Sequence, residues 1–177
     1  DNGSLVIGAT DYLFYTSEPV TNVVYAGLTV SNFTAAAFRF GADAKSEVSF
    51  DACRVKKCGT AASLGNVDLK MSNCELTLNT HALASSASAS VEGSVKTVLT
   101  DCLFADCTAG GRLAVAGVEL SGLMTSYLTN CTFRGNYAYG DYGTKGGDAA
   151  LSLSGAGVCE VVDCSFVSNR TARNAAN

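Results

Sequence analysis

The sequence lacks several features that would identify a particular class of protein. It contains no apolar run that approaches the ~20 residues of a membrane-spanning helix, so we expect no direct membrane span. With 12 Lys and Arg against 16 Asp and Glu, it has no surplus of basic residues for nucleic acid, whose phosphates require a basic stripe. It has one histidine, His81, and no Cys-x-x-Cys, so we expect neither a metal site nor a cofactor.

A short pattern that restarts seven times is the most informative feature present. Each copy has an anchor residue, and successive anchors lie 20 to 33 residues apart, at Tyr12, Phe33, Cys53, Cys74, Cys102, Cys131 and Cys164. Asn or Asp precedes the anchor in six of the seven copies, which indicates a turn because these residues tolerate left-handed backbone angles. A repeat of this length predicts a solenoid of stacked coils.

Apolar or small residues occupy alternate positions on both sides of each turn. In the fourth copy, Leu69 and Met71 come before Asn73, and Cys74 and Leu76 follow it. This period of two predicts strand, bend, strand, with one face of each strand turned inward. Helices are disfavoured because the segments are short, Gly is frequent, and β-branched and aromatic residues fill the inward positions.

A second corner is predicted five residues after each anchor. Several copies have an inward Asn there (Asn79, Asn136 and Asn169), which can bond backbone groups of the adjacent corners. Three strands and two corners per turn are typical of a parallel β-helix. We therefore predict an all-β fold, a single parallel β-helix domain over residues 1–177, with coils that start near residues 5, 28, 48, 69, 97, 126 and 159.

The later copies resemble the repeats of the polymorphic outer-membrane-protein family. Residues 133–136 and 166–169 read Phe-x-x-Asn, and Gly146-Gly147-Asp-Ala-Ala-Leu is similar to the Gly-Gly-Ala-aliphatic element of that family. More broadly, the chain resembles right-handed parallel β-helices of the pectin-lyase-like class. The resemblance implies a right-handed β-helix of about seven coils, an architecture found in surface adhesins and many secreted proteins, and it implies no particular activity.

Eight cysteines are many for a cytosolic protein of this size. Three pairs share a spacing of five residues: Cys53 with Cys58, Cys102 with Cys107, and Cys159 with Cys164. The two members of a pair are expected to face the same interior corner, so disulfides within a coil are predicted for an oxidising compartment. The alternative is a ladder of reduced anchor cysteines stacked one coil apart, because sequence alone does not give connectivity.

Four N-glycosylation sequons occur, at Asn2, Asn32, Asn130 and Asn169. We expect Asn32 and Asn130 to occupy the same outward corner, where a glycan projects away from the core, and Asn169 to stay bare because it points inward. Together with the cysteines, the sequons favour a secreted or cell-surface glycoprotein. Any export signal is then expected to have been removed or to lie outside these residues, since nothing at the start resembles a signal peptide.

One Gly-rich segment could contact a ligand or a partner. It carries three tyrosines with an acidic and a basic residue: Tyr137, Tyr139, Asp141, Tyr142 and Lys145. These side chains could stack on a sugar ring or a partner surface, and surface glycans are therefore possible partners. The alternative is an ordinary exposed loop whose tyrosines cover the flank of the rod.

No constellation of catalytic residues is evident. Polysaccharide lyases and hydrolases need clustered carboxylates, whereas Asp101, Asp106 and Asp163 are spread over several coils. The sequence therefore favours a structural or adhesive module, with a carbohydrate-binding or polysaccharide-cleaving protein as the alternative. The position of four residues would discriminate between them, because an enzyme would gather these in one cleft: Glu119, Asp141, Lys145 and Asp148.

The two ends of the predicted rod have no recognisable caps. Residues 1–6 lead directly into the first coil, and residues 170–177 are too few to close another. Open ends of a solenoid expose strand edges and apolar core. We therefore expect the partners to be other protein subunits or the remainder of a longer chain, joined end to end.

Overall fold

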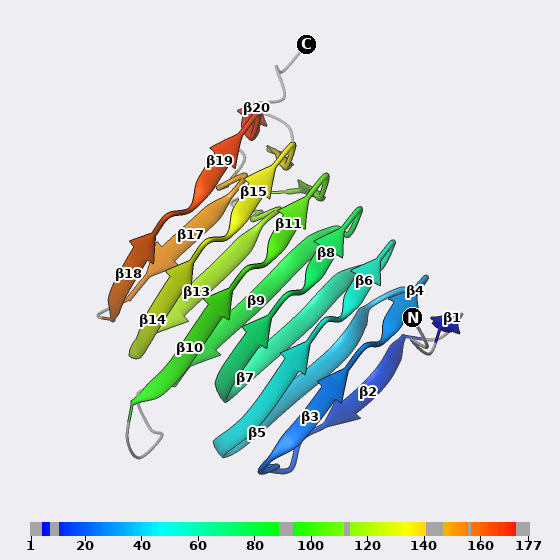
Figure 1. The fold of residues 1–177 in the computed structure, drawn as a ribbon, viewed down its shortest axis with the longest axis vertical. Helices are drawn as coiled ribbons and strands as arrows, with labels where there is room; N and C mark the ends of the chain where they lie inside the picture. The colour runs from blue at the N-terminus through cyan, green and yellow to red at the C-terminus, as the bar shows by residue number, and fades with distance from the viewer. Residues whose placement is uncertain are drawn as a thin grey trace.

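A computed structural model describes residues 5–7, 11–88, 94–111, 114–140, 147–155 and 157–172. Every regular element within these ranges is a β-strand, and all the strand pairs are parallel. Successive coils stack into a rod whose first strands lie at one end and whose last strands lie at the other (Figure 1). The predicted all-β, right-handed parallel β-helix is confirmed.

The first face of the rod is a seven-stranded sheet that contains one short strand from each coil. Its strands are hydrogen-bonded in chain order: β1 (Leu5–Ile7), β4 (Thr29–Ser31), β6 (Arg54–Lys56), β8 (Glu75–Thr77), β11 (Leu103–Ala105), β15 (Thr132–Arg134) and β19 (Ser165–Val167). Because spatial order equals chain order, each coil adds one strand beside the one before it, and the coils number seven.

A second sheet covers the other two faces. Its strands are β2 (Tyr12–Thr16), β3 (Val23–Ala26), β5 (Ala36–Asp51), β7 (Thr60–Ser72), β9 (His81–Ala87), β10 (Val95–Thr100), β13 (Val118–Gly122), β14 (Met124–Thr129), β17 (Leu151–Ser154) and β18 (Val158–Val162). The long strands β5 and β7 bend and take part in both faces, with an irregular register between Gly41 and Ser46. A small third sheet contains β12 (Thr108–Gly110), β16 (Tyr137–Tyr139) and β20 (Arg170–Ala172), where the later coils carry extra residues.

Columns of apolar side chains fill the interior along the rod axis. On the first face, the register places Phe133 between Phe104 and Phe166. The Phe104 and Phe133 rings stack with centroids 5.1 Å apart, and Phe133 and Phe166 stack at 4.7 Å and 4°. Similar columns run down the other faces, so each inward residue packs on its counterparts in the adjacent coils. Burial repeated in this way, coil after coil, stabilises the rod.

Two columns of corner residues let the chain turn inward at both ends of each first-face strand. The first column comprises Gly27, Ala52, Asn73, Asp101, Asn130 and Asp163, and the second comprises Asn32, Lys57, Leu78, Asp106, Gly135 and Ser168, all with φ between 50° and 65°. This left-handed backbone is unfavourable for residues with a Cβ, which explains why Asn, Asp and Gly predominate. Backbone N–H groups at these corners donate to the following coil, as from Asn73 to Thr100 and from Leu78 to Ala105.

The predicted register is wrong for the first two copies. The Arg54 N–H donates to the Leu28 carbonyl, as the Glu75 N–H does to Cys53, so Leu28 and not Phe33 is the anchor of the second coil. Phe33 lies at the second corner, because the Gly59 N–H donates to its carbonyl. The Asn-Phe pair at 32–33 has the residue types expected of a first corner, although the chain makes that corner at Gly27.

Candidate functional site

Three places on the described surface bear on a possible function: the end of the rod formed by the last coil, a shallow trough on one flank, and the tyrosine-rich segment. The first of these is the most unusual. Leu153, Val161 and Phe166 point inward in the register, yet they are 51%, 41% and 49% exposed. Their counterparts one coil earlier, Leu120, Leu128 and Phe133, are at most 2% exposed. Within the described ranges, the last coil therefore presents an exposed cross-section of the apolar core.

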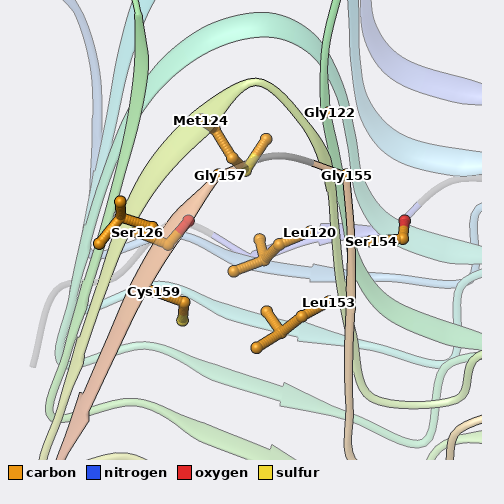
Figure 2. A pocket seen from close by; sticks show the side chains of 10 residues that line it. Leu120, Gly122, Met124, Ser126, Leu153, Ser154, Gly155, Gly157 and Cys159 are labelled. Atoms are coloured by element: carbon orange, nitrogen blue, oxygen red, sulfur yellow. The ribbon is translucent and has the colours of Figure 1, made fainter.

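A hollow of about 70 Å³ lies between the walls of the rod at this end. Figure 2 shows Ser126 and Cys159 on one wall, from β14 and β18, facing Leu120 and Leu153 on the other, from β13 and β17. One coil deeper, the register places the buried Ser85 beside Leu120 and the buried Thr97 beside Ser126. The hollow is far smaller than the roughly 300 Å³ of even a small ligand pocket, so we interpret it as packing space between the walls of the rod.

The trough on the flank is larger, about 340 Å³. Its floor is made of glycine and serine, including Gly41, Gly65 and Ser86, because these outward positions of β5, β7 and β9 carry almost no side chain. Arg39 and Glu119 are its two charged lining residues. A trough of exposed backbone and hydroxyl groups suits a polar ligand.

An aromatic cluster adjoins the trough at Arg39. The guanidinium lies 5.6 Å from the ring centroid of Tyr12 and 5.8 Å from that of Tyr15, and its Nη1 donates a 2.7 Å hydrogen bond to Tyr12 Oη. Sequence reasoning missed this cluster because it treated Tyr12 as an inward anchor. The recurrence of small residues at positions 41, 65 and 86 was the available clue to the trough.

Catalytic carboxylates do not converge in the part of the chain that the structure describes. Glu119 lies on the trough, whereas Asp148 is separate from it and accepts a backbone hydrogen bond from Ala116. Asp141 and Lys145 lie outside the described residues. His81 is half-buried, and burial lowers its pKa although nearby Glu119 opposes the shift. Among the described residues, no group of three His, Cys, Asp or Glu side chains could hold a metal ion.

The tyrosine-rich segment lies partly on the flank of the third sheet. The rings of Tyr137 and Tyr139 are 5.7 Å apart, and the guanidinium of Arg170 lies 4.9 Å from the Tyr137 centroid. The Tyr139 ring lies so close over Gly110 that a Cβ there would be 2.3 Å from its Cζ. These two tyrosines thus cover the flank, while Tyr142, with Asp141 and Lys145, falls outside the described residues.

The expected disulfides are absent from the structure, in which all eight cysteines are free thiols. Cys53 and Cys58 lie at opposite ends of β6, as Cys102 and Cys107 do of β11. An extended strand advances about 3.3 Å per residue, which separates their Cα atoms by more than the roughly 7 Å that a disulfide can span. Cys159 and Cys164 are half-buried on either side of the first corner of the last coil, and they are also unbonded. The arrangement is the alternative ladder of reduced anchor cysteines.

A second column, at the other corner, contains both cysteine and asparagine. Asn79 accepts from the Cys58 N–H at 2.9 Å and donates to the Val55 carbonyl at 3.0 Å. Asn136 likewise accepts from Cys107, and Asn169 both accepts from Asn136 and donates to Phe133 at 2.8 Å. The three residues of the predicted corner ladder therefore connect coils, and burial raises the pKa of the Cys107 thiol to about 11.

The sequon asparagines Asn32 and Asn130 are both exposed, although at different corners. Asn32 belongs to the second corner column, so the expectation that they share one corner is wrong. Each side chain is open to solvent, as attachment of a glycan requires, and glycosylation at these two positions stays a prediction. Asn169 is half-buried and its amide is bonded to the Phe133 carbonyl, which agrees with an inward position.

Comparisons with known proteins address the fold. The described residues form no helix of the length and hydropathy that a membrane crossing needs. Searches of curated proteins and of solved structures found no match to the chain. A family model described as a right-handed beta helix region matches residues 18–176, which is nearly the whole chain. With its parallel sheets, stacked core and paired corner columns, the chain belongs to the right-handed beta helix region family.

Proposed function

We propose that this β-helix is a structural or adhesive module of a secreted or cell-surface protein, which acts without catalysis through assembly or surface contact. The observation that carries the proposal is the exposed apolar cross-section at the last coil. Exposed sequons at Asn32 and Asn130 and the resemblance to polymorphic outer-membrane-protein repeats support the location. The partners would be other subunits or the remainder of a longer chain, stacked end to end.

The opposite end of the rod offers a surface that fits such a stack. In the second sheet, the column of inward side chains that begins at Phe14 continues through Phe38 to Leu151. The column that begins at Tyr25 continues through Phe50 to Val161. A further coil placed in register would therefore set apolar residues on apolar residues. Among the described strands, β2 and β3 pair only with β5, so their outer edges can also accept backbone hydrogen bonds.

Substituting Phe166→Glu is expected to abolish concentration-dependent association of the isolated chain. The substitution places a charge in the middle of the exposed cross-section, where stacking would desolvate it. The measurement is sedimentation velocity over a wide range of protein concentrations. The matched control is Leu78→Glu, because Leu78 is as exposed as Phe166, at 51% against 49%, but lies at a corner in the middle of the rod, away from both ends.

The wild-type chain and the Leu78→Glu variant should then associate, whereas Phe166→Glu should sediment as a monomer. A wild-type chain that stays strictly monomeric at high concentration would contradict assembly through this end. Equal association of all three proteins would place the contact elsewhere on the rod.

The trough favours carbohydrate contact as a second candidate function. A floor of backbone and hydroxyl groups beside the Tyr12, Tyr15 and Arg39 cluster combines stacking surface with hydrogen-bonding groups, as saccharide sites require. Screening acidic and neutral polysaccharides for binding and for cleavage tests it, with Arg39→Ala as the variant. We expect binding without cleavage, weakened by about tenfold in Arg39→Ala, since a charge-assisted contact contributes about 1.5 kcal/mol. Cleavage products would instead favour the enzyme alternative.

A further inference from the structure

The five anchor cysteines form a continuous column of thiols along the rod. Cys53, Cys74, Cys102, Cys131 and Cys164 occupy the same place in consecutive coils, immediately before β6, β8, β11, β15 and β19. The backbone fixes this register, because the N–H after each anchor donates to the carbonyl of the anchor before it, as from Thr132 to Cys102 at 2.8 Å. Neighbouring anchors are therefore one coil apart, about 4.8 Å, which lies within the Cα range of disulfides, about 4.4–6.8 Å.

Each thiol also points toward the coil that precedes its own. Cys131 Sγ lies 3.5 Å from the Leu99 carbonyl of the coil before it, and Cys164 Sγ lies 3.6 Å from the Leu128 carbonyl. The Cys131 N–H donates to Cys164 Sγ at 3.4 Å. Each sulfur thus lies over the preceding anchor, and rotation of the side chains, without movement of the coils, would bring neighbouring sulfurs together.

Access to the column is confined to one end. The first four thiols are buried, at no more than 2% exposure, whereas Cys164 in the last coil is half-buried. Of the anchor thiols, a reagent from solution therefore meets Cys164 first. The hydrogen bond between the Cys102 and Cys131 thiols lowers the pKa of Cys131 and raises the pKa of Cys102, so the thiolate is favoured at Cys131, next to Cys164, whose own pKa is raised by burial.

We propose that the anchor column is a cross-linking site, in which a small disulfide such as oxidised glutathione reacts at Cys164 and the resulting disulfides join consecutive coils. The Cys164 thiolate attacks one sulfur of the glutathione disulfide, forming a mixed disulfide and releasing one glutathione. The Cys131 thiolate then attacks Cys164 Sγ and expels the second glutathione, which takes up a proton. Two cysteines lose two electrons and two protons, and the glutathione disulfide gains them.

The cross-link can move inward by exchange. The Cys102 thiol gives up its proton and attacks Cys131 Sγ, the Cys131–Cys164 bond breaks, and Cys164 leaves as a thiolate that takes up that proton. The end thiol is then free to react again. Because the column has five members, two disulfides leave one thiol unpaired, so the pairs are not locked in one arrangement. This inference concerns the isolated coil stack and does not depend on the proposed assembly.

Peptide mapping tests the proposal, because trypsin separates every neighbouring pair of anchors. Cys74, Cys102 and Cys131 fall in peptides 71–96, 97–112 and 113–134, and Cys164 falls in peptide 146–170. After incubation of the full chain with oxidised glutathione, we expect 113–134 linked to 146–170 first and 71–96 linked to 97–112 later. Closing loops of about 30 residues should raise the melting temperature by roughly 10 °C.

Two variants separate this mechanism from its competitors. Cys164→Ser should slow the loss of the free anchor thiols Cys74, Cys102 and Cys131 about tenfold or more, because these anchors are buried. Cys159→Ser, which removes the other thiol of peptide 146–170, should leave the linkage to 113–134 and its rate unchanged. Loss of the linkage in Cys159→Ser, a link between 46–54 and 58–70, stable glutathionylation without a cross-link, or no loss of thiols would each overturn the proposal.

Discussion

Replacing Phe133 with Ala is expected to lower the free energy of unfolding by about 3–5 kcal/mol. The ring is fully buried and stacks on Phe104 at 5.1 Å and on Phe166 at 4.7 Å. Removing the ring loses the free energy gained by transferring a phenyl group from water to the core, and it leaves a cavity between two coils. The cavity cannot collapse easily, because backbone hydrogen bonds hold β11, β15 and β19 in parallel register on both sides.

Urea denaturation followed by circular dichroism measures this loss. Phe166→Ala is the matched control, because the same ring in the next coil is 49% exposed and contacts a coil on one side only. We expect less than half the destabilisation there. Equal losses in the two variants would show that the last coil is covered as well as the interior coils are, and that this end of the core is not exposed.

Asn136→Ala is expected to cost about 2–6 kcal/mol, although the side chain removed is small. The Asn136 amide accepts from the buried Cys107 N–H at 3.1 Å and donates to the Phe104 carbonyl at 2.9 Å. Alanine would leave both backbone groups buried without a partner, at about 1–3 kcal/mol each. The effect is therefore a loss of hydrogen-bond satisfaction at a corner, with little loss of apolar burial.

Asn130→Gly provides the control for this second substitution. Asn130 is exposed and its amide donates to Asp101 on the surface, and glycine tolerates its φ of 52°. We expect a change below about 1 kcal/mol in the same denaturation measurement. If Asn136→Ala and Asn130→Gly destabilised the protein equally, the buried corner column would have no special structural role.

The five cysteine anchors could be aligned from sequence because each follows a left-handed corner and precedes an alternating strand. The first two copies could not, since Gly27-Leu28 makes the same corner without Asx or cysteine. Asn32-Phe33 has those residue types but turns the second corner. Both corners need the same left-handed backbone, so residue type alone does not distinguish them. Hydrogen bonding between coils does, and it depends on residues more than 20 positions away.

The sites were harder to predict than the fold for a related reason. A spacing of five residues places Cys53 and Cys58 at two corners of one coil, whereas proximity in space joins Cys53 to Cys74 of the next. The trough at Arg39 depends on which strand positions face outward and carry no side chain. Both properties emerge only when coils are stacked, and a single repeat does not contain them.

The direction of the hydrogen bonds between coils gives the rod an anisotropic mechanical response. These bonds run along the rod axis, and the first and last strands lie at its opposite ends (Figure 1). A tensile force applied across the ends therefore loads the bonds of one terminal coil at a time instead of shearing many strands together. We expect the packed core to resist bending and lateral compression, and we expect the rod to lengthen in steps under tension. Each step releases a coil of 21 to 33 residues, the spacing of the cysteine anchors, and so absorbs work.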